Sequence, residues 1–272
     1  LQRHLIEIGS LPETVLTDQD SLPMSAEQLA AAVEVVSVRK EEPTDEEIRQ
    51  RAQAVAALLA HPDDALPLLR EAYASAATPE SKLTYAQMLA VLGDSTGLPT
   101  LVEEVEGIEA WDEGWNYRGM GQFGTALSYL DRLIVALGRA GDPKALPAIL
   151  AKAKLLTAES DFSHHRAVGL ALEMIGDSAA AGPLAEILTQ PDMTGYVHDT
   201  VQQARRRDQE DTGGTVGVKT RRDSIRELLL ARALYRCGDY GDVGKQILTQ
   251  YTKDLRGHFA RHAQAVLEKG KD

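Results

Sequence analysis

The sequence predicts an all-α protein, arranged as a right-handed α-solenoid of helical hairpins. The main observation is a phrase that occurs five times: a helix-like apolar run, a small turn that is usually Gly-Asp, and a second short apolar run. The copies are LLAHPDDALPLL from Leu58, VLGDSTGLPTLV from Val91, ALGRAGDPKALPAIL from Ala136, MIGDSAAAGPLAEIL from Met174 and YRCGDYGDVGKQIL from Tyr235. A recurring helix-turn-helix unit is the signature of stacked helical repeats.

Composition and the weakness of strand signals support the same fold class. Hydrophobic residues make up 43% of the chain but aromatic residues only 5%, so small aliphatic side chains fill the core and helices can approach closely. Only residues 215–218 read as extended, and they lie in a Gly-rich stretch.

Residues 1–43 are predicted to form an N-terminal helical and linker segment. A short helix over residues 1–8 stops at Gly9, and a second helix runs from a Ser25 cap to Val38, with Gln28 at the capping-box position. The first residue is Leu, which indicates either a cleaved export signal or a piece of a longer protein. The opening residues favour the second alternative, because they read as the tail of an upstream domain.

Residues 44–272 are predicted to form the repeat domain, which begins with the acidic first turn TDEE after Thr44. Apolar residues recur at spacings of three and four in the helices. Glycines are expected at helix C-termini, where a left-handed conformation suits them; they are Gly93, Gly138, Gly176 and Gly238. Prolines are expected in the first turn of the following helices; they are Pro67, Pro99, Pro147 and Pro183.

The aspartates of the repeated turns are expected to cap the following helices, and their spacing locates two insertions. They stand at positions 63, 94, 142, 177 and 239, at intervals of 31, 48, 35 and 62 residues. The longer intervals imply insertions near residues 106–123 and 190–221, which we call the first break and the second break. Insertions in repeat proteins often lie on the binding face, so we expect function at the breaks.

Charge and cysteine content exclude several function classes. A net charge of -12 lacks the electrostatic footprint of a protein that binds nucleic acid or anionic membranes. No run of 18 apolar residues is present, so no membrane-spanning helix is expected. The single Cys237 excludes an intrachain disulfide and a cysteine-based zinc site. His258 and His262 have the i, i+4 spacing of metal ligands but lack a third ligand, so no metal is expected.

The first break contains both tryptophans and the densest group of candidate binding residues. A formal G-x-G-x-x-G at residues 119–124 lacks the βαβ context of a dinucleotide site and reads as an ordered loop. Two alternatives follow for the aromatic residues: a stacking surface for a sugar, a flavin edge or a peptide, or a plug between two repeats, which we favour. The candidate binding residues are Trp111, Asp112, Trp115, Asn116, Tyr117, Arg118, Asp131, His164 and His165.

Asp131 belongs to that group because it lies on the same helical stripe as Leu127 and Ile134. A buried carboxylate needs a partner, and the candidates are Arg118, His164 and His165. A structural ion pair is favoured over catalysis, and no catalytic residue is predicted.

Two groups of arginines bracket residues 208–219, which lie inside the second break. Residues 205–207 are Arg-Arg-Arg, and Arg221, Arg222 and Arg226 follow the intervening segment DQEDTGGTVGVK. They could form a positive collar that binds phosphate or an acidic partner, or they could pair with the chain's own acids. In a chain of this net charge, we favour the second alternative.

The LGD and IGD turns, the ALP helix starts and helices such as HHRAVGLALEMIG resemble HEAT-like repeats, especially the short bacterial form of phycobilisome-lyase proteins, over about residues 44–268. This resemblance implies scaffolding or partner binding. The opening LQRHLIEIGS is similar to the closing segment of bacterial FAD-dependent oxidoreductases, and WDEGWNYRGMGQFG looks like a HEAT-containing extension of that family. That second resemblance implies that FAD-binding residues lie upstream and that none lies in this chain.

We therefore expect a non-catalytic binding or scaffold module, soluble in the bacterial cytoplasm or periplasm, whose partner is a protein or an upstream domain of the same polypeptide. It is expected to bind no cofactor itself. The alternative is an accessory region of a FAD-dependent oxidoreductase whose 111–124 loop contributes to a substrate or cofactor pocket.

Overall fold

A computed structural model describes residues 24–38, 42–115, 128–210 and 218–270, and within these ranges every regular element is a helix. The predicted all-α class is therefore confirmed. Of the segment expected to be extended, only Val218 is described, and it begins a helix. The helix predicted over residues 1–8 lies outside the described residues. No described helix has the length and apolar character needed to cross a membrane.

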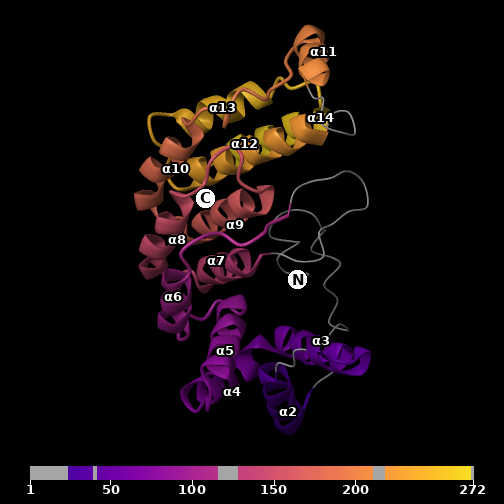
Figure 1. The fold of residues 1–272 in the computed structure, drawn as a ribbon, viewed down its shortest axis with the longest axis vertical. Helices are drawn as coiled ribbons and strands as arrows, with labels where there is room; N and C mark the ends of the chain where they lie inside the picture. Colours follow the sequence, from indigo (N-terminus) through magenta and orange to yellow (C-terminus); the bar gives the residue numbers. More distant parts are fainter. Residues whose placement is uncertain (1–23, 39–41, 116–127, 211–217, 271–272) are drawn as a thin grey trace. The chain divides into compact units, whose positions relative to one another are not determined.

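The chain divides into two compact units, Leu1–Thr100 and Leu101–Asp272 (Figure 1). The first contains α2 (Ala26–Ser37), α3 (Asp45–Ala60), α4 (Pro62–Ala74) and α5 (Pro79–Val91). Helix α2 contacts the other three, and its Leu29 shares a core with Leu58, Leu69 and Leu89. Ser25 forms the predicted capping box with Gln28 at the start of α2, and Thr44 begins α3 in the same way, whereas α4 begins without a side-chain cap.

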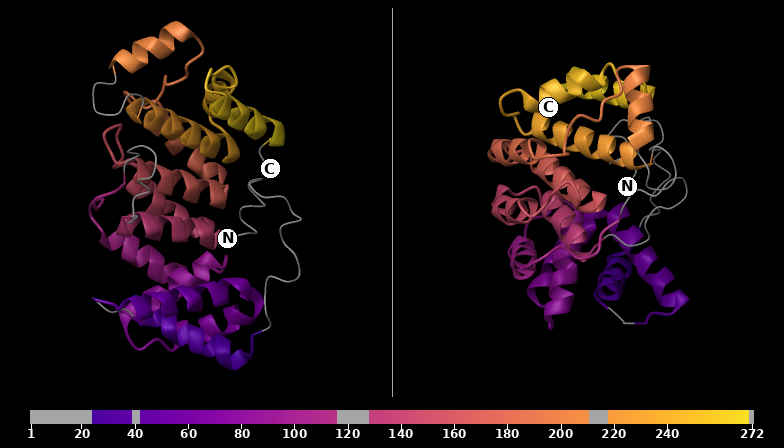
Figure 2. Two further views of the ribbon diagram at one scale, coloured as in Figure 1. Left: turned by 90° about the vertical axis from the view of Figure 1, so that its right-hand side faces the viewer. Right: turned by 45° about the horizontal axis from the view of Figure 1, so that its top comes forward.

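The second unit contains the remaining helices, preceded by α6 (Leu98–Gly107), which spans the division. The α-helices are α7 (Tyr129–Ala140), α8 (Leu146–Ala153), α9 (Phe162–Ile175), α10 (Ala181–Leu188), α11 (Val201–Glu210), α12 (Val218–Arg236), α13 (Val243–Tyr251) and α14 (Gly257–Lys269). Two short 3-10 helices, η2 (Pro143–Ala145) and η3 (Ser178–Ala180), precede α8 and α10. Helix α7 packs on α9, and α9 packs on α12. The shorter α8 contacts α9, and α10 and α13 contact α12. Helix α11 lies at the end of this unit (Figure 2).

The predicted role of glycine in the turns holds at three of four positions. Gly93, Gly176 and Gly238 have positive φ angles of 79°, 66° and 100°. Gly138 is an error of the prediction, because it lies inside α7, which ends instead at Gly141 with φ 66°. A Cβ atom on Gly138 would stand 2.3 Å from the Cα of Ala171, so this glycine allows α7 and α9 to approach closely.

The turn aspartates and the prolines lie where they were predicted in every repeat except the first. Asp94, Asp142 and Asp177 each accept a hydrogen bond from the backbone N–H two residues later, and Asp239 accepts from the start of α13. Pro99, Pro147 and Pro183 lie in the first turns of α6, α8 and α10. Asp63 and Pro67 were misplaced: only His61 separates α3 from α4, so Pro62 begins α4 and Pro67 lies in its interior.

Candidate functional site

At the first break, Trp111 and Asp112 bind to the helices that follow them. The Trp111 ring stacks on His164 with centroids 4.4 Å apart, and its Nε1 donates to the carbonyl of Lys152 at 3.2 Å. The Asp112 carboxylate accepts from the backbone N–H groups of Tyr129 (2.6 Å) and Leu130 (3.2 Å) at the start of α7. Burial acts to raise the pKa of Asp112, but these hydrogen bonds outweigh it and lower the pKa.

The next residues attach to the start of α9. The backbone N–H of Gly114 donates to Asp161 Oδ2 at 2.8 Å. The backbone N–H of Trp115 donates to Ser163 Oγ at 2.9 Å, and the backbone N–H of Ser163 donates to the Trp115 carbonyl at 3.0 Å. The Trp115 ring meets Phe162 edge-on at 5.8 Å. Residues 111–115 are therefore held in place by contacts within the chain.

Asp131 has the partner that its position required. His164 Nδ1 lies 2.8 Å from Asp131 Oδ1, and both side chains are buried. Asp131 Oδ2 has no hydrogen-bond partner among the described residues. Of the other two predicted partners, Arg118 lies outside the described residues, as do Asn116 and Tyr117. His165 faces elsewhere, with Nδ1 3.2 Å from the carbonyl of Asp161.

The two adjacent histidines thus face different partners, so they do not point toward a common metal ion. Burial lowers the pKa of His165 to about 3, and the nearby Arg226 guanidinium acts in the same direction, so this imidazole is neutral. Within the described ranges, no three His, Cys, Asp or Glu side chains are placed to hold a metal ion.

At the second break, an irregular segment over residues 192–198 lies between α10 and α11, and a buried carboxylate holds it. Glu227 on α12 accepts from the backbone N–H groups of Gly195 and Tyr196, both at 2.9 Å, and from the Tyr251 hydroxyl at 2.8 Å. Burial raises the pKa of Glu227, although these hydrogen bonds act in the opposite direction. One side chain therefore joins the segment to both α12 and α13.

The loop before α14 holds the same segment through an ion pair. Arg256 donates to the carbonyl of Tyr196 at 2.8 Å and pairs with Asp254 at 2.7 Å. Asp254 in turn accepts from the backbone N–H of His198 at 3.0 Å. Buried carboxylates from α12 and from the loop before α14 thus position the backbone of residues 195–198, which we call the wall.

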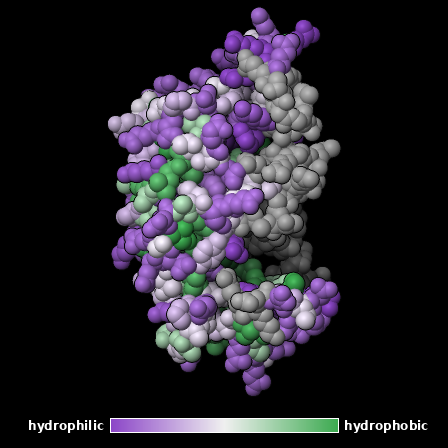
Figure 3. All heavy atoms as spheres, in the orientation of Figure 1, coloured by the Kyte–Doolittle hydropathy of each residue, from purple (hydrophilic) through white to green (hydrophobic). Residues whose placement is uncertain are grey.

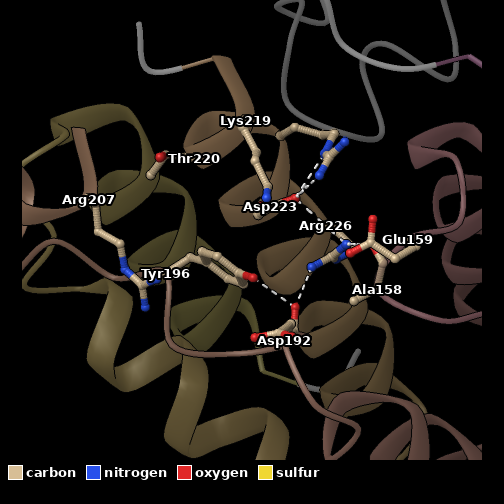
Figure 4. A pocket seen from close by; sticks show the side chains of 10 residues that line it. Ala158, Glu159, Asp192, Tyr196, Arg207, Lys219, Thr220, Asp223 and Arg226 are labelled. Atoms are coloured by element: carbon tan, nitrogen blue, oxygen red, sulfur yellow. Dashed lines mark hydrogen bonds and ion pairs between the residues drawn. The ribbon is translucent and has the colours of Figure 1, made fainter. Parts of the chain in front are cut away.

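Two cavities flank this wall. The first, which we call the Arg222 cavity, has a volume of about 230 Å³ and is lined by Ala158, Glu159, Asp192, Tyr196, Arg207, Lys219, Thr220, Arg222, Asp223 and Arg226 (Figure 4). The second, the Arg206 cavity, has a volume of about 240 Å³ and is lined by Gly195, Val197, Gln203, Arg206 and Arg207. Arg207 lines both, donates to the carbonyl of Gly195 at 2.9 Å and lies 5.2 Å from the centre of the Tyr196 ring.

One buried carboxylate serves two guanidinium groups in the Arg222 cavity. Arg222 lies 2.8 Å from Asp223 Oδ1, and Arg226 lies 3.7 Å from the same oxygen. Arg226 also donates to the carbonyls of Ala158 and Asp192 at 2.7 and 2.6 Å. The expectation that arginines of the second break pair with the chain's own acids is confirmed for these two.

Sequence reasoning missed several residues of this site. Tyr196, Lys219 and Glu227 belong to no motif, and Glu227 reaches its partners from 31 and 32 residues away. The signal that could have identified the site was the presence of two groups of arginines in and directly after the second break. Comparison of the chain with protein-family models, with curated proteins and with solved structures finds no match.

Proposed function

We propose that this chain is a non-catalytic helical-repeat binding module that holds a protein partner at the second break. We further propose that its helices form a right-handed α-solenoid of HEAT-like hairpins. The order of contacts in the second unit supports this arrangement, because α7 packs on α9 and α9 on α12. In a solenoid each repeat contacts its neighbours in sequence order.

The observation that carries the binding role is the pair of cavities that share Arg207 at the second break. Their common wall is positioned by buried side chains, as expected of a preformed site. The hydrophilic residues that dominate the surface around α11 suit a polar, reversible interface better than a permanent one (Figure 3).

A non-catalytic role is favoured by the burial of the His–carboxylate pair. His164 and Asp131 are 3% and 0% exposed, so a substrate cannot reach them without a change of conformation. The partner is a separate protein, as the resemblance to HEAT-like repeats implies, or an upstream domain of the same polypeptide, as the resemblance to the flavoenzyme family implies.

Site-specific photo-crosslinking tests this proposal. A photoreactive residue in place of Gln203, which lines the Arg206 cavity, should form an adduct with one protein in extracts of the source organism. The same residue in place of the exposed Lys154 on the second unit is the control. Identical adducts at both positions, or none at Gln203, would show that the second break does not bind a partner.

A further inference from the structure

Two exposed arginines on neighbouring helices of the second unit face each other without an acid between them. Arg139 lies in the last turn of α7, and Arg166 lies in the second turn of α9. Neither forms a hydrogen bond or an ion pair within the described part of the chain. Partial burial lowers the pKa of Arg139, and repulsion from the Arg166 guanidinium acts in the same direction. We call these two residues the first arginine pair.

The next two arginines along this surface share a single acid. Glu173 of α9 pairs with Arg232 at 2.7 Å and also with Arg236, and both arginines come from α12. Arg232 and Arg236 are the second arginine pair. The neighbouring His262 adds no positive charge at neutral pH, because burial and the Arg232 guanidinium lower its pKa.

Each pair therefore lacks one negative charge. The acid closest to the first pair is Asp131, which attracts Arg166 but is buried and already bonded to His164 through Oδ1 at 2.8 Å. Two guanidinium groups thus face one carboxylate at the first pair, and Glu173 gives the second pair the same ratio. A deficit of one charge at each pair matches a carboxylate, which carries a single charge when ionised.

The two pairs lie side by side on one surface. Arg166, Leu170 and Glu173 recur at i, i+4 and i+7 along α9, so they share one helix face, and Leu170 is partly exposed there. Arg139 stands level with Glu173, because the preceding residue of α7 faces Ala171. Helices α7, α9 and α12 are stacked in this order (Figure 1). Packed helices lie about 8–10 Å apart, so the two pairs are separated by about that distance.

We propose that this surface, which we call the arginine face, binds an acidic peptide segment of a protein partner in the polyproline II conformation. Side chains three residues apart in that conformation lie on the same side and about 9 Å apart, which matches the separation of the two pairs. Each arginine can hold a carboxylate through two parallel hydrogen bonds. Leu170 offers an apolar contact to the peptide residues between the two acids.

The charge of the whole chain favours a short acidic peptide over a nucleic acid. The phosphates of a nucleic acid continue beyond the two pairs, where a protein of net charge -12 repels them. The arginine face is also separate from the second break, because none of its four arginines lines either cavity.

The test measures the binding of fluorescent peptides to the whole 272-residue chain by anisotropy. The first peptide has the sequence GSEPPESG, the second has glutamine in place of both glutamates, and the third, GSEEPPSG, places the glutamates side by side. We expect the first peptide to bind about a hundredfold more tightly than the second, since each charge-assisted hydrogen bond contributes about tenfold. It should bind about tenfold more tightly than the third, which reaches only one pair. Equal binding of the first peptide and either counterpart would overturn the proposal.

Matched variants then locate the binding. Arg139→Gln and Arg236→Gln should each weaken binding of the first peptide by about tenfold. Arg139→Gln remains informative if Arg236→Gln unfolds, because Arg139 has no ion pair to lose. Lys154→Gln removes the same charge from an exposed residue outside the three helices, so binding should stay within about twofold of that of the unchanged chain. Equal losses in all three variants would assign the effect to overall charge and overturn the site.

Competition and crosslinking separate this proposal from its alternatives. If a single-stranded oligonucleotide displaces the peptide at a lower concentration than unlabelled peptide does, the face binds nucleic acid and the peptide assignment is wrong. If no peptide binds while a photoreactive residue at Gln203 still captures one protein, the second break stands and the arginine face fails. If the first peptide binds as expected and no adduct forms at Gln203, the arginine face stands and the second break fails.

Discussion

Replacing Gly138 by alanine tests the packing of α7 on α9, on which the arrangement of the second unit depends. A Cβ at this position would lie 2.3 Å from Ala171 Cα, 2.8 Å from its Cβ and 3.0 Å from its carbonyl oxygen. Real Cβ atoms do not approach other atoms this closely, and two of the three contacts are to backbone. The conflict cannot be relieved by rotating a side chain, so the two helices must separate.

Two opposing effects set the size of the change. Alanine favours a helix interior over glycine by about 1 kcal/mol, which acts to stabilise the variant. Overpacking a well-packed core costs about 1–3 kcal/mol, and backbone contacts place this site at the upper end. We therefore expect Gly138→Ala to lower the free energy of unfolding by about 2 kcal/mol.

Urea denaturation followed by circular dichroism measures this change. Gly182→Ala is the matched control, because Gly182 lies in α10 and a Cβ there would meet no atom within 4 Å. That variant should be unchanged or slightly stabilised. If Gly138→Ala is as stable as Gly182→Ala, the close approach of α7 and α9 is wrong.

Three further predictions follow from the buried polar groups. The pKa of His165 is lowered from 6.5 to about 3 in the folded protein, so below pH 6.5 protons bind the unfolded chain preferentially. The free energy of unfolding should therefore fall as the pH is lowered from 6.5 to 4. Denaturant titrations of a His165→Gln variant should show a weaker dependence of this free energy on pH. An equal dependence in both proteins would contradict the buried neutral imidazole. Glu227→Ala removes the acceptor for three donors at Gly195, Tyr196 and Tyr251, and should cost about 3 kcal/mol or more in thermal and urea unfolding. A loss below about 1 kcal/mol would mean that Glu227 does not hold the segment. Trp111→Ala removes the half-buried ring that stacks on His164 and donates a hydrogen bond to Lys152, and should lower the free energy of unfolding by about 2 kcal/mol. The yield of the crosslinked adduct at Gln203 should not change. Loss of the adduct in a folded variant would assign binding to the first break.

Much of the helical framework could be predicted because its signals are local. A capping box such as Ser25–Gln28 and turn aspartates such as Asp142 act within three residues of themselves. The need of Asp131 for a partner could also be predicted, since a carboxylate on an apolar stripe is costly when alone. The choice of His164 among three candidates required the structure.

The errors and omissions have a common physical origin. A glycine that ends a helix and a glycine that admits a neighbouring helix look alike in sequence, which explains the error at Gly138. The wall of the cavities depends on Glu227 and Arg256, which act across 31 to 60 residues and match no local pattern. Sequence spacing located the second break but not the side chains that position it.

Backbone amide shifts from NMR, recorded while the partner protein captured by crosslinking at Gln203 is added to the whole chain, test the central claim most directly. The largest shift changes should occur at residues of the two cavities, such as Gly195, Tyr196 and Thr220. The amide shifts of Trp111 and Trp115 should stay unchanged, because these residues are held by contacts within the chain. Changes centred on the two tryptophans, with the second break unaffected, would contradict the central claim.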